Sequence, residues 1–259
     1  MRLKVGKAGW LCWYVAILWQ VGRADAQSLI LGIPNADVAH KGVLEITHES
    51  QIGVRSPVTW NSFNIFTTGI TDRTELTFSL INLDNTILPG ATFAAGAKHI
   101  IPLSDGPAEW RLTAGANIGF APRLNYQPWG FFPYSHLSCR LPGWRTRLTG
   151  GVAYGTPHFF GFKNKRPTGQ EYQPADGVYM ASIMAGVEHP LTKRLWLVAD
   201  WFSGNQVQGA LIAGFQYDWG PSALLLAYKL PNGSLSKNAI VTEVVVDIPY
   251  ARKKTPAAH

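Results

Sequence analysis

The chain has 259 residues, enough for one or two domains, and only 15% of them are charged. Soluble globular domains carry about a quarter charged residues, whereas this chain combines few charges with ten tryptophans and 26 glycines. This composition argues against a disordered chain and favours a protein in an apolar environment.

The N-terminus has the three parts of an export signal. A basic stretch over residues 1–9 precedes the apolar run 10–22, and Ala24 and Ala26 form an A-x-A cleavage site. We therefore predict a cleaved signal peptide over residues 1–26; the alternative, a transmembrane anchor, is disfavoured because the run is short. The 19 Lys and Arg and 15 Asp and Glu that remain give a net charge of +4, which does not indicate a nucleic-acid partner. Cys139 is then the single cysteine, so no internal disulfide can form.

Residues 27–42 precede the first predicted strand, and they form either a periplasmic lead-in or a plug in the lumen. From residue 43 onward, apolar side chains occupy every second position over long stretches, for example residues 109–121. A period of two is typical of a β-strand with two different faces. We predict twelve strands, the sixth of which contains Pro133: 43–50, 61–70, 73–83, 91–103, 109–121, 131–141, 144–155, 178–189, 194–202, 208–219, 222–230 and 239–250.

The gaps between these strands alternate in length along the chain. Each odd-numbered gap, such as 51–60 or 156–177, is longer than the even-numbered gaps beside it, such as 71–72 or 142–143. Long loops at one end and tight turns at the other are typical of an up-and-down transmembrane β-barrel. We therefore predict an all-β fold, an antiparallel transmembrane barrel of about 12 strands over residues 43–250.

Strand length supports a membrane barrel over a soluble sandwich or a lipocalin-like barrel. Aromatic and apolar residues recur ten positions apart on one face, and ten residues tilted by about 40° rise about 25 Å, the height of an outer-membrane apolar band. The predicted membrane-interface aromatics are Trp110, Phe120, Trp144, Tyr154 and Tyr250.

This pattern resembles that of bacterial outer-membrane β-barrel proteins, which are porin-like in architecture, over residues 43–250. The resemblance implies a Gram-negative outer-membrane location, contact with outer-membrane lipids and lipopolysaccharide, and recognition of a terminal aromatic, here Tyr250, by the barrel-assembly machinery. The chain departs from the family by continuing as a tail over residues 251–259. The sequence leaves the oligomeric state open.

If the apolar rows face lipid, the charged side chains of the other rows line the lumen. Basic residues gather on the fourth, fifth and seventh strands, and acidic ones on the rest of the wall. They would either set a transverse field across a channel or pair to fill a closed lumen. The predicted pore-lining residues are Glu45, Glu75, Lys98, Arg111, Arg145, Arg147, Glu188, Asp200, Asp218, Glu243 and Asp247.

The favoured function is a narrow passive channel for small solutes, without enzymatic activity, cofactor or metal site. The alternative is a closed barrel with a structural or surface-binding role, or a lipid-directed hydrolase.

The hydrolase alternative depends on His48 and Ser50, which form an H-x-S triplet. This triplet is similar to the H-x-S motif of outer-membrane phospholipase A and of lipid A deacylases. The resemblance implies that His48 activates Ser50 as a nucleophile on the lipid-facing side. The chain departs from the motif at Gln51, where those families have asparagine or a similar residue, and an orienting asparagine would have to be Asn61 or Asn64. We favour the interpretation that the triplet is a polar strand end at the membrane interface.

Overall fold

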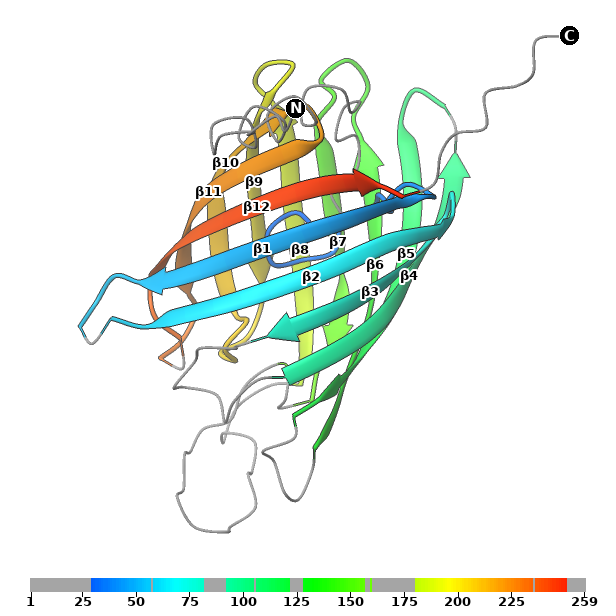
Figure 1. Cartoon of the computed structure of the whole chain (residues 1–259). Helices are drawn as coiled ribbons and strands as arrows, with labels where there is room; N and C mark the ends of the chain where they lie inside the picture. Colours follow the sequence, from blue (N-terminus) through cyan, green and yellow to red (C-terminus); the bar gives the residue numbers. More distant parts are fainter. Residues whose placement is uncertain are drawn as a thin grey trace, which may run out of the picture.

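The computed structural model describes residues 29–56, 58–81, 92–104, 106–121, 128–156, 159, 180–234 and 236–250. The predicted signal peptide and the predicted C-terminal tail lie outside these residues. Within them, twelve antiparallel strands close into one barrel, in which each strand pairs with its chain neighbours and β1 pairs with β12 (Figure 1). The strands are β1 (Val43–Gly53), β2 (Trp60–Thr71), β3 (Thr74–Ile81), β4 (Thr92–Ser104), β5 (Glu109–Phe120), β6 (Trp129–Arg140), β7 (Arg147–Tyr154), β8 (Ala181–Pro190), β9 (Leu195–Phe202), β10 (Ala210–Trp219), β11 (Ser222–Pro231) and β12 (Ala239–Pro249). The predicted all-β, up-and-down architecture is confirmed.

Strand ends differ from the prediction by a few residues, most clearly at β7. This strand begins at Arg147 rather than at residue 144, because Arg145 has a left-handed φ of 56° and Gly143 one of 74°. These conformations belong to a turn, which the Leu141 N–H closes by donating to the Thr146 carbonyl at 2.8 Å. Pro133 is tolerated in β6 because it lies just beyond the β6–β7 register, which begins at Tyr134.

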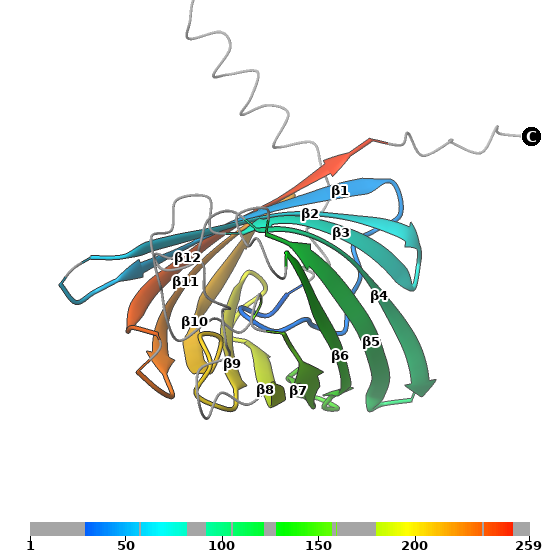
Figure 2. The ribbon, with the colours of Figure 1, turned by 90° about the horizontal axis from the view of Figure 1, so that it is seen from below.

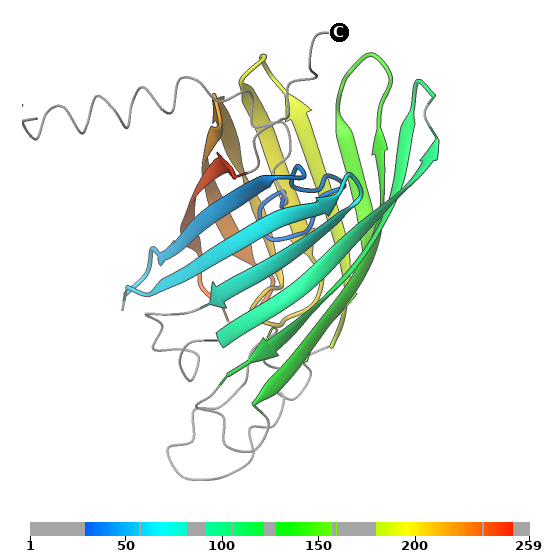
Figure 3. The same cartoon turned by 45° about the vertical axis from the view of Figure 1, so that its right-hand side comes forward.

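The outward rows of the barrel are apolar and exposed. On β11, Leu224 and Leu226 are 51% and 57% exposed, whereas Leu225 between them is 1% exposed. Because an exposed apolar band on every side is unfavourable in water, the surface fits the hydrocarbon region of a bilayer. Figure 3 shows that the strands are inclined to the barrel axis, as closure of a barrel requires.

The predicted interface aromatics lie near the ends of strands or in the adjoining turns. Trp110, Trp144, Tyr154 and Tyr250 are 40%, 73%, 47% and 62% exposed. Phe120 is half-buried, because its ring lies 4.8 Å from that of Trp129 on the neighbouring strand.

The segment before β1, residues 29–42, lies inside the ring of strands (Figure 2). We call it the inner segment. Its apolar side chains, Ile30, Leu31 and Ile33, are at most 1% exposed, and they form the centre of the buried core. The lumen is therefore occupied by protein. Among the described residues, no helix is long and apolar enough to cross a membrane.

Candidate functional site: the lumen and the inner segment

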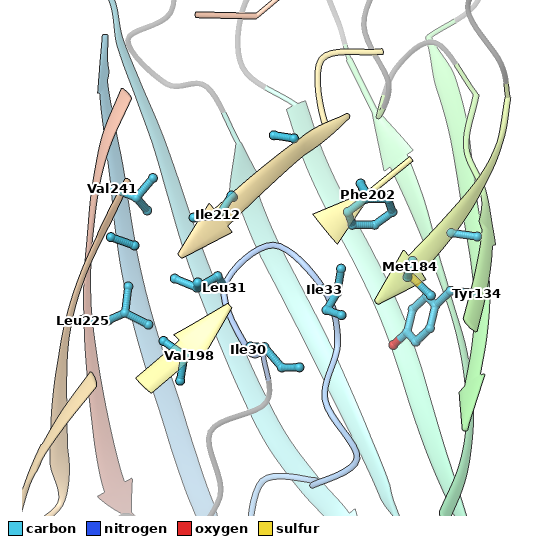
Figure 4. Packing of buried hydrophobic residues seen from close by; sticks show 13 residues of the cluster. Ile30, Leu31, Ile33, Tyr134, Met184, Val198, Phe202, Ile212, Leu225 and Val241 are labelled. Carbon is cyan, nitrogen blue, oxygen red and sulfur yellow. The ribbon is translucent and has the colours of Figure 1, made fainter. Parts of the chain in front are cut away.

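One side of the lumen wall is apolar and binds the inner segment. Inward-facing residues of β8 to β12 supply Met184, Val198, Ile212, Leu225 and Val241, all at most 5% exposed. Figure 4 shows the loop of the inner segment among these side chains. Burial of large aliphatic side chains on both sides stabilises this contact through the hydrophobic effect.

The turn of the inner segment is held by a single carboxylate from β9. Asp200 Oδ2 accepts hydrogen bonds from three consecutive backbone N–H groups, those of Leu31 at 3.1 Å, Gly32 at 2.6 Å and Ile33 at 3.0 Å. Asp200 is itself 2% exposed. Buried N–H groups need acceptors, and this one carboxylate oxygen supplies the acceptor for three of them in the turn.

A second anchor lies nearer the tight-turn end and consists of ion pairs. Asp37 of the inner segment contacts the guanidinium of Arg111 at 2.7 Å and that of Arg147 at 2.5 Å. Arg147 also contacts Glu188 at 3.3 Å, and Arg111 donates to the Ala36 carbonyl at 3.0 Å. Burial raises the pKa of Asp37, but attraction by Arg147 and then by Arg111 outweighs burial and holds the pKa below its ordinary value.

A third anchor joins the end of the inner segment to β2 and β3. The Ala39 N–H donates to Glu75 at 2.7 Å, and Glu75 forms an ion pair with Lys98 at 3.0 Å. Lys41 makes a parallel bridge to Gly69. A side chain at position 69 would overlap the backbone of residues 39–41, so the close approach requires glycine.

Among the described residues, the inner segment borders a larger and a smaller cavity. The larger has a volume of about 150 Å³ and lies between Leu31, Gly32 and Pro34 and a wall that combines polar side chains, such as Thr67 and Lys98, with aromatic and aliphatic ones, such as Phe132. The smaller, about 80 Å³, lies toward the tight-turn end. The consecutive residues Pro34 and Asn35 line different cavities, so the inner segment separates them.

The predicted pore-lining residues occupy different environments in the structure. Glu45, Glu75, Lys98, Arg147, Asp200 and Glu243 are buried, whereas Arg111, Glu188, Asp218 and Asp247 are partly exposed. Arg145 lies exposed in the turn before β7, where it lines the smaller cavity.

Within the described residues, the ion pairs of these charges are mostly local. Lys98 pairs with Glu75 of the adjacent strand, and Arg147 pairs with Glu188 of the adjacent strand and with the inner segment. The described ion pairs thus join basic residues mainly to acidic residues nearby. Two of these ion pairs, those of Asp37, hold the inner segment.

Several luminal residues were not among the predicted ones. Asp37 carries the ion-pair anchor, and Lys229 of β11 donates to Gln51 at 3.0 Å, which in turn donates to Glu49 at 2.6 Å. Alternation within the strands β1 and β11 was the available signal for Glu49, Gln51 and Lys229. Asp37 had no such signal because its segment has no strand pattern.

His48 and Ser50 lie on the outer face of β1, as their strand parity predicted. Of the two candidate asparagines, Asn61 stands opposite Gln51, which lines the larger cavity, so it belongs to the luminal face. Asn64 stands opposite His48 on the outer face. The described residues contain no group of three or more His, Cys, Asp or Glu that could hold a metal ion.

No protein-family model and no curated protein matches the sequence. Among solved structures, the chain is similar to the KdgM porin in complex with disordered oligogalacturonate, with 8% identity over 82% of this chain and 99% of that one and a TM-score of 0.44. It is also similar to OccK11 (OpdR) of Pseudomonas aeruginosa, with 13% identity over 81% of this chain and 67% of that one and a TM-score of 0.34.

The fold and the outward apolar band define a class: a twelve-stranded, membrane-spanning antiparallel β-barrel whose lumen holds the segment that leads into β1.

Proposed function

We propose that the protein is an outer-membrane channel for small polar solutes, in which the inner segment sets the width of the path. The observation that carries this proposal is the larger cavity, whose wall opposite the inner segment presents hydroxyl, amide and charged groups beside aromatic ones. A volume of about 150 Å³ has room for several water molecules. A lumen packed for structure alone would be expected to fill that space with side chains.

The polar side chains on one part of this wall give hydrophilic solutes hydrogen-bonding partners. Thr67, Thr77, Ser79, Lys98 and Asn117 line the cavity from β2 to β5. Such groups replace the hydration of a passing solute, and a fixed Lys98–Glu75 pair presents both signs of charge at 3.0 Å. Passage into the smaller cavity requires displacement of the inner segment near Pro34 and Asn35, because these residues separate the two spaces. We therefore expect a low conductance.

Single-channel recording in planar bilayers tests the proposal. Thr77→Cys in a Cys139→Ala background places a thiol in the cavity wall, and reaction with a bulky, charged thiol reagent is expected to reduce the conductance step. Phe78→Cys is the matched control, because Phe78 is the next residue of β3 and is 46% exposed on the lipid-facing side. The reagent is expected to leave its conductance unchanged.

Folded wild-type protein that gives no conductance steps would refute the channel. Steps that respond equally to modification at Thr77 and Phe78 would place the current outside the cavity.

A further inference from the structure

The outer face of the barrel carries a hydrogen-bond chain that the channel does not use. His48 Nε2 lies 3.1 Å from Ser50 Oγ, and His48 Nδ1 lies 2.8 Å from Asn64 Oδ1. The first two residues share a face of β1, and β2 presents Asn64 directly opposite His48. Three side chains from two adjacent strands thus form one continuous chain from hydroxyl to imidazole to amide.

The direction of these hydrogen bonds determines which nitrogen of the His48 imidazole carries the proton. An amide oxygen only accepts, so His48 Nδ1 carries the proton and donates it to Asn64 Oδ1. His48 Nε2 then has a free lone pair, which accepts the Ser50 hydroxyl. This is the arrangement in which a histidine acts as general base for a serine nucleophile and a third group holds its tautomer.

Two hydrogen-bond donors lie beside the serine. The indole N–H of Trp60 donates to Ser50 Oγ at 3.2 Å. Ser62 stands directly opposite Ser50 in the register, and its hydroxyl is buried without a hydrogen-bond partner among the described residues. Donors at this place can stabilise the negative oxygen that develops when a carbonyl carbon is attacked.

The height of the site on the barrel indicates its substrate. Ser50 lies three residues before the end of β1 on the long-loop side, which faces the cell exterior in outer-membrane barrels. The apolar side chains of Ile52 and Trp60 nearby are 42% and 47% exposed. The site therefore lies at the boundary between the outer-leaflet acyl chains and the headgroups, which is where the carboxylic esters of lipids lie.

We propose that Ser50, His48 and Asn64 form a lipid-facing esterase site that cleaves long-chain fatty-acid esters of the outer leaflet. Ser50 Oγ attacks the ester carbonyl carbon while its proton passes to His48 Nε2, and the alcohol leaves with that proton, so that an acyl-serine remains. Water then attacks the acyl carbon, its proton passes to His48, and the fatty acid leaves as Ser50 is reprotonated. Ester and water thus give acid and alcohol, and Asn64 is a positioning residue throughout.

This activity is independent of conduction, because it uses the opposite face of the wall. The sequence alone favoured a polar strand end at this position. The two aligned hydrogen bonds, with the orienting residue on the neighbouring strand, are the reason to assign a site there.

The test measures fatty-acid release by the full chain, refolded in mixed micelles of a nonionic detergent with either phosphatidylethanolamine or purified lipid A. These two substrates distinguish a phospholipid from an acylated glycolipid. Ser50→Ala is expected to lower release by at least about 1,000-fold. Thr242→Ala is the matched control, because Thr242 stands opposite Ser50 on β12 and outside the chain of hydrogen bonds. The Thr242→Ala variant is expected to release fatty acid at the same rate as the wild type.

Fatty-acid release by two Asn64 variants distinguishes a role in orienting His48 from a purely structural role. Asn64→Ala is expected to lower release by about 100-fold, and Asn64→Asp, which keeps an acceptor for His48 Nδ1, is expected to restore most of it. Heat-modifiable gel mobility establishes that each variant is folded. Folded wild-type protein that releases no fatty acid from either substrate would overturn the proposal, as would release that Ser50→Ala leaves unchanged.

Discussion

The three hydrogen bonds at Asp200 allow the strength of the inner segment's attachment to be altered at one residue. Asp200→Ala removes the acceptor for the N–H groups of residues 31–33, and no other change in the strand is needed. The docked form of the inner segment should then be less stable relative to the undocked form, while the pairing of the barrel strands is unchanged.

The magnitude follows from the number of buried donors that lose a partner. A buried N–H without a partner costs about 1–3 kcal/mol. Water can enter the space left by the carboxylate and bind the N–H groups. Removal of the carboxylate also removes the free-energy cost of burying it. Both effects reduce the loss of docking free energy, so the lower end of the range applies. Three donors then weaken docking by about 3 kcal/mol, or roughly 100-fold in the docking equilibrium.

Thiol reactivity at position 32 measures this equilibrium. A Cβ at Gly32 would lie 3.5 Å from Ile212 and 3.8 Å from the Asp200 oxygens, which is ordinary contact, so Gly32→Cys fits the docked form. In a Cys139→Ala background, we expect Asp200→Ala to raise the labelling rate of this thiol by roughly 100-fold.

Glu49→Gln is the matched control for charge. It also neutralises a buried luminal carboxylate, but the hydrogen bond to Glu49 comes from Gln51 of the wall and not from the inner segment. A labelling rate that Asp200→Ala leaves unchanged, or that Glu49→Gln raises equally, would refute the assignment of Asp200 as the anchor.

Three further predictions concern other contacts. Because the pKa of Asp37 lies below its ordinary value, its ion pairs are fully formed above a pH of about 4 and are lost as the pH falls through the lowered pKa. The conductance of the wild type is therefore expected to stay constant down to that pH and to rise below it. The Asp37→Ala variant is expected to show the higher conductance at every pH. Gly69→Ala forces a methyl group into the backbone of the inner segment and is expected to lower the free energy of unfolding by about 1–3 kcal/mol, whereas Gly150→Ala, with open space around it, should not. Leu226→Lys in the middle of β11 is expected to lower the unfolding free energy from lipid vesicles by about 2–4 kcal/mol, and Trp144→Lys in a turn by less than about 1 kcal/mol.

Each of these has an outcome that contradicts it. A conductance of the Asp37→Ala variant that still rises when the pH falls below about 4 would show that other carboxylates control the inner segment. Equal stability of the two glycine variants would mean that the inner segment does not approach Gly69 closely. Equal effects of lysine at Leu226 and Trp144 would contradict a lipid-facing β11.

The architecture could be predicted because alternation is a local property. On β5, Arg111 and Thr113 face inward and Trp110 faces outward, as period two requires. The start of β7 could not, because the left-handed conformation of Arg145 lies in a segment that also alternates. An alternating sequence occurs both in this turn and in the strand that follows it, so alternation alone does not show where β7 begins.

The candidate site was less predictable because its contacts join distant parts of the chain. Asp37 and Arg147 are 110 residues apart, and no spacing rule relates them. The choice of Asn64 over Asn61 depends on the β1–β2 register, in which His48 stands opposite Asn64. A shift of one residue would have reversed the faces of both asparagines.

The position of the inner segment also constrains the order of assembly. The segment leads directly into β1, and β1 forms the closing seam with β12, the last strand to be made. The apolar residues Ile30, Leu31 and Ile33 pack on β8 to β12 inside that seam. A barrel that closed first would have to admit a folded loop through one end, against side chains already in place. We therefore expect the segment to dock while the seam is still open, so that it serves as a template on which the C-terminal strands are gathered before the ring closes.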